Sequence, residues 1–203
     1  MSKSLSIFNV QVWGIKEALI RAKYPMATTV NMSMESDTRT IEDLLDLGGR
    51  LGGSPHGHGD DKFLRQIKIG FDMLAPRYFW QQFATYHHTE INSQSTMHKG
   101  KSLDYDRMAN KYVDPFVLAR FKDIVARFVE DPSEANLLRV KSNLPEGIRI
   151  SAGITTNYAQ LKTMYYQRKT HRLPEWRSFC KWVESLPYAK ELGVCGKVSS
   201  EAE

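Results

Sequence analysis

An alternation of apolar and polar side chains over residues 67–73 is the feature that most constrains the fold of this chain. Its apolar members are Ile67, Ile69, Phe71 and Met73. Neighbouring side chains of a β-strand point to opposite faces of the sheet. This pattern therefore predicts a half-buried strand, with its apolar face in the core and its polar face more exposed. A half-buried strand must be part of a sheet whose apolar face is covered by other elements. The helices predicted elsewhere in the chain can cover that face.

Helical and strand patterns occupy most of the remaining sequence. The clearest helix follows Asp114, a capping residue, and Pro115, which suits a first helical turn. Apolar residues then recur with helical spacing up to residue 128, and this predicts a helix that packs in a core. The other predicted helices are 15–23, 41–51, 133–143, 158–168 and 174–186, and the other predicted strands are 5–12 and 148–150.

The loosest stretch of the sequence lies between Gly48 and Gly59 and contains six glycines. Glycine permits a positive φ angle and a close approach of the backbone to another group. No Gly-Lys-Ser/Thr ending is present, so a triphosphate-binding loop is not supported. We expect a flexible surface loop here, and further loops at 26–35 and at 99–113, the latter with a short helix.

The composition fits one globular domain. Of the 203 residues, 41% are hydrophobic and 25% are charged, which is enough apolar content for a core. No run of about 18 apolar residues is present, so we expect no membrane span. We predict a single domain over residues 1–193 and a disordered polar tail over 194–203.

Charge and cysteine content bear on partners and on the cellular compartment. The net charge is +5, but Lys and Arg are scattered, and no long basic block marks a nucleic-acid-binding arm. Nucleic acid is therefore not an expected partner. The two cysteines, Cys180 and Cys195, make no disulfide framework, and we expect a cytoplasmic protein.

The segment from Pro76 to His98 carries an unusual density of polar groups. Pro76 suits a first helical position, and Phe79, Phe83 and Tyr86 share one face of a helix, so we expect a helix here. Its donors, acceptors and titratable groups are those of Gln82, His87, His88, Glu90, Asn92, Ser95 and His98. Although histidines and acids are metal-ligand types, none here follows a standard spacing such as His-Glu-x-x-His, and no metal site is predicted.

The order of these residues resembles the signature helix of the flavin-dependent thymidylate synthases. The family pattern reads Arg-Gln-Trp, then Arg-His-Arg two residues on, and then Ser-x-Asn-Glu-x-Ser-x-Arg-Tyr. Gln82 and Phe83 stand at the Gln and the Trp of this pattern. Asn92 matches the Asn, and Ser95 matches the second Ser. The register fits without a gap.

The chain departs from this pattern where the family has its arginines. Thr85, Tyr86 and His87 replace Arg-His-Arg. The other replacements are Glu90 for the first Ser, Ser93 for the Glu, and Met97-His98 for Arg-Tyr. The chain therefore resembles a diverged relative of the family.

A second block of resemblance to the same family covers residues 141–168. The family pattern there is Arg-x-x-Leu-Pro, a strand, and a Thr-x-Asn-x-x-x-Leu helix that ends in Leu-Arg. Two blocks in the right order favour a shared fold. The matching residues are Lys141 (in place of the Arg), Leu144, Pro145, Thr155, Asn157, Leu161 and Arg168.

The resemblance implies an α/β (α+β) fold with a central, mostly antiparallel sheet flanked by helices, and assembly into a homotetramer. It implies FAD as cofactor and a pyrimidine nucleotide such as dUMP as substrate. The implied reaction transfers a one-carbon unit from methylenetetrahydrofolate to C5 of the base, without a cysteine nucleophile. The implied nucleotide-binding residues are Gln82, Ser95, Lys141 and Arg168, and the implied cofactor-binding residues are His87, Asn92 and Asn157.

The chemistry of these side chains leaves two functions open. Arg168 offers a planar donor fork that matches a uracil carbonyl edge, and Lys141 offers a point charge for a phosphate. Lys141 could equally be a solvated lysine on a helix, and the less favoured alternative for Arg168 is a surface arginine near a helix C-terminus. The missing arginines weigh against full activity, because histidine is mostly neutral at pH 7. The alternative is a non-catalytic nucleotide-binding or regulatory protein on the same fold.

Overall fold

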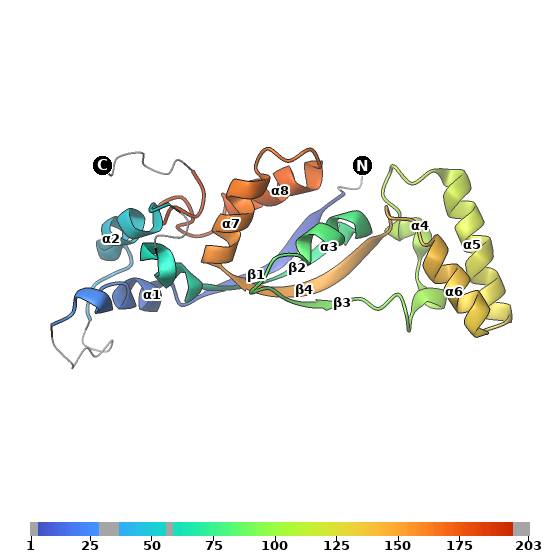
Figure 1. The fold of residues 1–203 in the computed structure, drawn as a ribbon, viewed down its shortest axis with the longest axis horizontal. Helices are drawn as coiled ribbons and strands as arrows, with labels where there is room; N and C mark the ends of the chain where they lie inside the picture. Colours follow the sequence, from blue (N-terminus) through green and yellow to red (C-terminus); the bar gives the residue numbers. More distant parts are fainter. Residues whose placement is uncertain (1–3, 29–36, 56–58, 197–203) are drawn as a thin grey trace. The chain divides into compact units, whose positions relative to one another are not determined.

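The computed structural model describes residues 4–28, 37–55 and 59–196 of the chain (Figure 1). The strands are β1 (Ser6–Trp13), β2 (Lys68–Pro76), β3 (Glu90–Ser93) and β4 (Arg149–Asn157). The helices are α1 (Ile15–Arg21), α2 (Glu42–Gly52), α3 (Arg77–Phe83), α4 (Tyr105–Met108), α5 (Pro115–Glu130), α6 (Glu134–Asn143), α7 (Tyr158–Arg168) and α8 (Pro174–Val183). Short 3-10 turns lie at Tyr24–Met26, Asp60–Arg65 and Gly100–Ser102.

The strands form an antiparallel four-stranded sheet in the order β1-β2-β4-β3, and this confirms the predicted α+β class. In β2, alternate side chains from Ile69 to Ala75 are buried, as the pattern of apolar residues predicts. β4 continues to Asn157, well beyond the predicted end at residue 150. Because β4 has a neighbouring strand on each side, its polar residues find backbone partners that a local pattern does not reveal.

The chain divides into two compact units. Among the described residues, the first unit comprises 4–8, 72–85 and 91–154. The second unit comprises 9–28, 37–55, 59–71, 86–90 and 155–196. Each unit is described by itself.

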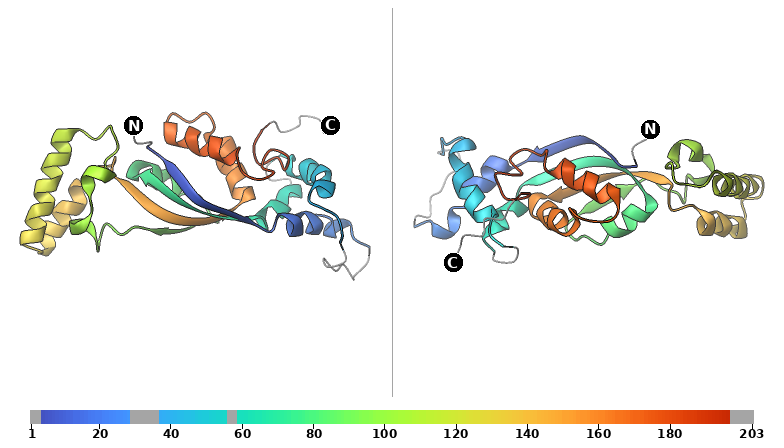
Figure 2. Two further views of the ribbon diagram at one scale, coloured as in Figure 1. Left: turned by 180° about the vertical axis from the view of Figure 1, so that it is seen from behind. Right: turned by 90° about the horizontal axis from the view of Figure 1, so that it is seen from above.

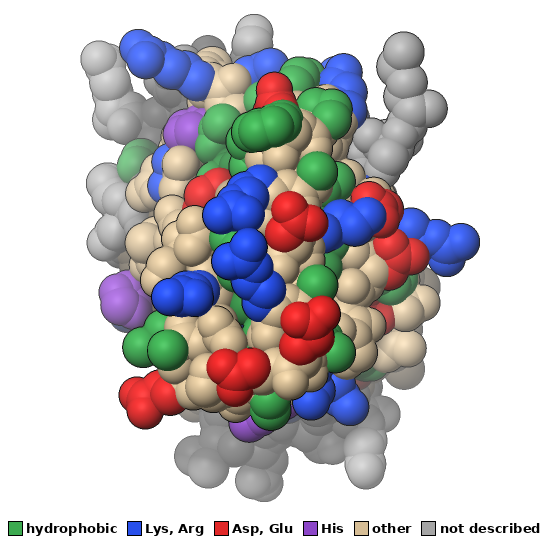
Figure 3. Space-filling model, turned by 90° about the vertical axis from the view of Figure 1, so that its right-hand side faces the viewer, with side chains coloured by type: hydrophobic (Ala, Val, Ile, Leu, Met, Phe, Trp, Pro, Cys, Tyr) green, Lys and Arg blue, Asp and Glu red, His purple; other side chains and the backbone are tan. Residues whose placement is uncertain are grey.

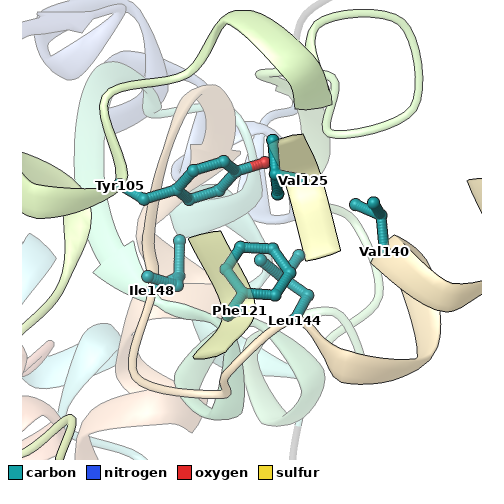
Figure 4. Packing of buried hydrophobic residues seen from close by; sticks show 6 residues of the cluster. All are labelled: Tyr105, Phe121, Val125, Val140, Leu144 and Ile148. Atoms are coloured by element: carbon teal, nitrogen blue, oxygen red, sulfur yellow. The ribbon is translucent and has the colours of Figure 1, made fainter. Parts of the chain in front are cut away.

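The first unit contains a hairpin of α5 and α6, with α4 against α5 (Figures 1 and 2). The Asp114 side chain accepts hydrogen bonds from the backbone N–H groups of Phe116 and Val117, which confirms the predicted cap of α5. Phe121 is 1% exposed, and its ring meets the Tyr105 ring edge to face at 4.8 Å between centroids. Figure 4 shows the surrounding apolar cluster of Tyr105, Phe121, Val125, Val140, Leu144 and Ile148.

The outer surface of this hairpin mixes basic and acidic side chains with apolar ones (Figure 3). Phe116 on α5 is 82% exposed, and Leu138 on α6 is also mostly exposed. Apolar side chains that are scattered singly are common on protein surfaces. These two residues therefore do not by themselves mark an interface.

The predicted helix over residues 76–98 is wrong beyond Phe83, where α3 ends. The Thr85 hydroxyl donates to the Gln82 carbonyl at 2.7 Å and closes the last turn. His88 then adopts a left-handed conformation with φ of 56°, which a helix does not allow. The chain continues as β3 at the edge of the sheet, so strand pairing overrides the helical pattern of this segment.

The glycine-rich stretch is also different from its prediction, because residues 48–52 are the end of α2 and not a flexible loop. A Cβ atom on Gly49 would lie 2.7 Å from the Glu191 carbonyl oxygen, and one on Gly52 would overlap the Leu192 carbonyl. Glycine is therefore needed for the close approach of α2 to the segment at 191–192 within the second unit. Residues 56–58 of the predicted loop, and most of the predicted loop at 26–35, lie outside the described residues.

The second unit also packs α7 against α8 and α1 against α2. Val194 and Cys195 are buried, so the packed chain extends past residue 193, where the predicted tail begins. Residues 197–203 lie outside the described residues. No helix within the described ranges has both the length and the apolar character to cross a membrane.

Both cysteines are free and buried, in agreement with the prediction that they make no disulfide framework. Burial raises the pKa of the Cys180 thiol to about 12 and that of Cys195 to about 11. Both thiols are therefore protonated at neutral pH, and a protonated thiol is a poor nucleophile.

Candidate functional site

Two cations of the first unit lie close together where α3 begins and α6 ends. The Arg77 guanidinium donates to the Leu144 carbonyl at 3.2 Å and pairs with Glu146 at 3.5 Å. Lys141 lies one turn before Leu144, and its Nζ donates to Thr96 Oγ1 at 2.8 Å. Burial and the charge of Arg77 lower the pKa of Lys141. This local excess of positive charge suits a phosphate group.

A pocket of about 250 Å³ lies beside Arg77 in the same unit. The indole N–H of Trp80 donates to the Ala75 and Ile150 carbonyls, both at 3.0 Å, and this fixes the ring that forms part of the wall. The volume is slightly below the usual range for small-molecule sites, so the pocket suits one ring system or a small anion. The lining residues are Arg77, Trp80, Gln81, Ala84, Ile91, Ser93 and Ile150.

Ser95 is a predicted nucleotide-binding residue that lies next to Thr96, the partner of Lys141. Its Oγ accepts hydrogen bonds from the backbone N–H groups of Met97 at 3.2 Å and His98 at 3.0 Å. Because the oxygen is the acceptor in both, the hydroxyl proton is still available to a ligand. The structure thus brings the predicted residues Ser95 and Lys141 together.

Two further predicted residues of the first unit are placed on α3 and β3. Gln82 is half-buried near the end of α3, and Asn92 is exposed on β3. Their assignments to nucleotide and cofactor remain predictions.

Arg168, the last residue of α7, belongs to the second unit and is held by aromatic side chains. Its Nε donates to Tyr86 Oη at 2.7 Å, and Tyr86 Oη donates to Gln167 Oε1 at 3.0 Å. The guanidinium carbon lies 4.9 Å from the centroid of the Trp176 ring and 5.5 Å from that of Tyr86. The orientation of this guanidinium is therefore set by the protein before any ligand binds.

The other two predicted residues of the second unit are His87 and Asn157. His87 has an exposed side chain directly after Tyr86. Asn157 is only 6% exposed, and its Oδ1 accepts the backbone N–H of Gln160 at 3.0 Å, so it caps the start of α7. The cap uses the amide oxygen and leaves the role of Asn157 toward a cofactor as a prediction.

Lys162 is a buried charge that the sequence patterns do not reveal. Its Nζ donates to the Gly52 carbonyl at 2.8 Å, the Ser54 carbonyl at 2.9 Å and Asp61 Oδ2 at 2.9 Å. These contacts tie the end of α2 and the residues after it to α7 within the second unit. Lys162 is 2% exposed, so it supports the fold and does not meet a ligand.

Sequence reasoning also missed Arg77, Tyr86 and Trp176 as members of the candidate site. A basic residue directly after Pro76 and an aromatic residue eight positions after Arg168 were the available signals. Neither signal is specific without the contacts that the fold creates. Within the described ranges, no group of three or more metal-ligand side chains comes together.

Comparison with known proteins agrees with this fold. No protein-family model matches the chain, and no curated protein matches its sequence. The flavin-dependent thymidylate synthase ThyX from Helicobacter pylori, complexed with FAD and dUMP, superposes with a TM-score of 0.68 at 12% identity, over 92% of this chain and 98% of that chain. A second structure of that enzyme with FAD and dUMP gives 0.68 at 14% identity, over 94% and 97%.

A further solved structure with this fold is the UMP/dUMP methylase PolB from Streptomyces cacaoi bound with 5-Br dUMP. It superposes with a TM-score of 0.59 at 15% identity, over 94% of this chain and 91% of that chain. The chain therefore has the fold of the flavin-dependent thymidylate synthases, as its two blocks of resemblance predict.

Proposed function

We propose that this protein binds a pyrimidine nucleotide and, with FAD as cofactor, transfers a one-carbon unit to C5 of the base. The observation that carries the proposal is the oriented guanidinium of Arg168, on a fold whose solved examples hold dUMP or 5-Br dUMP. A planar guanidinium matches the carbonyl edge of a uracil ring. In the first unit, taken by itself, Lys141 and Ser95 offer a charge and a hydroxyl that suit a phosphate.

FAD sets a further requirement, because its diphosphate needs fixed cations. At positions 85–87 the chain has Thr85, Tyr86 and His87, and Tyr86 is already bonded to Arg168. His87 and His88 are exposed imidazoles, and neither offers the rigid donor fork of an arginine. Residues 85–87 thus lack the arginines that suit the diphosphate, so the proposed FAD would have to be held by other residues of the chain, and we derive no reaction step through the flavin.

The absence of arginines at positions 85–87 favours a second function. In this function the fold is kept, but the protein is a non-catalytic nucleotide-binding or regulatory protein. Such a protein binds the nucleotide without FAD and releases no tritium from nucleotide labelled at C5. The first function predicts a yellow protein, or quenching of FAD fluorescence, and tritium release that requires methylenetetrahydrofolate and a reductant. Thermal shift with FAD, dUMP, UMP, dCMP and folates decides between them, because a ligand at 100 times its Kd adds about 2.7 kcal/mol.

Arg168→Ala is expected to abolish the thermal stabilisation of the protein by a pyrimidine nucleotide. The fold should survive, because Arg168 lies at the partly exposed end of α7 and its hydrogen bond to Tyr86 contributes about 1.5–3 kcal/mol, less than the usual stability of a domain. Arg168→Lys should fail as well, since an ammonium group cannot reproduce the planar fork. The measurement is the shift in melting temperature at saturating dUMP.

Lys169→Ala is the matched control, because this exposed lysine follows Arg168 directly and lies about 100° away around the helix. The control should keep the nucleotide-induced shift of the wild type. An Arg168→Ala protein that binds every nucleotide as well as the wild type would show that the assignment of Arg168 is wrong. The assignments of Gln82 and Ser95 would then lose their main support.

We also propose self-association into a homotetramer, and a cytoplasmic location on the basis of the two free thiols. β1 is an edge strand of the sheet, and it exposes Phe8 (44%), Val10 (39%) and Trp13 (48%). An edge strand presents backbone groups that can pair with another chain, and exposed apolar patches mark interaction sites. Light scattering after gel filtration measures the number of copies.

A further inference from the structure

We propose that Tyr86 and Trp176 are positioning residues that fix the plane of the Arg168 guanidinium, so that its terminal nitrogens read the carbonyl edge of a planar base. This inference rests on the proposed function, and it names a device for base recognition within the second unit. Tyr86 stands where the family pattern has the His of Arg-His-Arg, so the device is a feature of this chain.

The first step of the argument is a short chain of hydrogen bonds. Arg168 Nε donates to Tyr86 Oη at 2.7 Å, so the phenol oxygen is an acceptor there. The phenol proton is then free for Gln167 Oε1, which lies 3.0 Å away. Arg168 and Gln167 are neighbours on α7, so both ends of this chain are anchored on one helix. Rotation of the guanidinium about its Nε would break the first bond.

The second step is the stacking of the guanidinium on Trp176. This tryptophan is fully buried at the start of α8, and its ring meets the Tyr86 ring at 5.7 Å with an interplanar angle of 65°. A buried ring cannot follow the arginine if the arginine turns. The Trp176 ring therefore fixes the plane of the Arg168 guanidinium. The hydrogen bond to Tyr86 fixes the direction in which the terminal nitrogens point within that plane.

The third step concerns the donors that remain. Within the described part of the chain, the two terminal nitrogens of Arg168 donate to no carboxylate within 4.0 Å and to no other acceptor, and neither is a buried, unpaired atom. Burial and the charge of Arg168 are among the causes that lower the pKa of the nearby His171, whose Nδ1 already accepts the backbone N–H of Leu173 at 3.1 Å. The fork is thus oriented and available.

The ligand that fits this arrangement is a planar ring with a carbonyl acceptor on its edge. A sugar phosphate without a base gains nothing from an oriented guanidinium, because a single phosphate oxygen accepts a donor from many directions. The proposal therefore separates the base from the phosphate. It predicts that loss of the Tyr86 hydroxyl affects only ligands that carry the base.

The test compares the binding of dUMP and of deoxyribose 5-phosphate to the full-length protein by calorimetry. Tyr86→Phe should weaken dUMP binding roughly tenfold, which is the order expected for one hydrogen bond to a charged group, and should leave deoxyribose 5-phosphate binding unchanged. Tyr166→Phe is the matched control. This variant removes the hydroxyl of a tyrosine on α7, which donates to the Gly196 carbonyl at 2.8 Å. It should change neither the Kd of dUMP nor that of deoxyribose 5-phosphate.

The outcomes separate this inference from the proposed function. Equal weakening of both ligands by Tyr86→Phe would indicate a general structural role and overturn the inference. The inference would also be overturned if Tyr86→Phe bound dUMP as tightly as the wild type while Arg168→Ala did not bind it. In that case the proposed function would stand. A wild-type protein that binds no pyrimidine nucleotide would overturn both.

Discussion

Lys162→Met is expected to lower the free energy of unfolding by about 3–5 kcal/mol, the usual cost of removing one partner of a buried ion pair. Methionine keeps much of the side-chain volume but donates no hydrogen bond. Asp61 is then left as a buried charge without its cation, and the Gly52 and Ser54 carbonyls lose their shared donor. Chemical denaturation followed by circular dichroism measures the change.

Two further variants make this prediction specific. Lys169→Met removes the exposed lysine directly after α7 and should alter stability by no more than about 0.5 kcal/mol. Asp61→Asn in the Lys162→Met background should recover part of the loss, because no uncompensated charge remains buried. If Lys162→Met matched the wild type in stability, the ion pair would contribute nothing to the fold.

Phe121→Ala should destabilise the first unit by about 3–5 kcal/mol, because it removes a large buried ring and leaves a cavity. Phe121 is 1% exposed and stacks edge to face with Tyr105 at the centre of the α4–α5–α6 cluster. The buried side chains packed around it relax only partly into such a space. Urea denaturation monitored by tyrosine and tryptophan fluorescence measures the loss.

Phe116→Ala is the matched control for this second prediction. It makes the same change on the same helix, but Phe116 is 82% exposed and lies outside the cluster. Its effect should stay within about 0.5 kcal/mol. Equal effects of the two variants would mean that the cluster does not hold the hairpin together.

Local chemistry determined several elements from the sequence. Asp114 and Pro115 start α5 because a carboxylate satisfies the free N–H groups of a first turn and proline needs none there. The alternation from residue 67 onward appears as the one-faced burial of β2. The order of residues in two separated blocks was sufficient to indicate the fold, since the positions that define a fold can persist when the overall identity is only 12–15%.

The tertiary structure decided what depends on groups far apart in the chain. The segment after Phe83 has helical spacing, yet it becomes β3 because the sheet offers it backbone partners. Gly49 and Gly52 are helical because another segment lies against them, and not flexible as their composition suggests. Lys162 meets Asp61 across 101 residues, and Arg168 meets Tyr86 across 82. A local sequence pattern contains no information on such long-range contacts. The free energy of each contact arises only when folding brings the two side chains together and removes them from water.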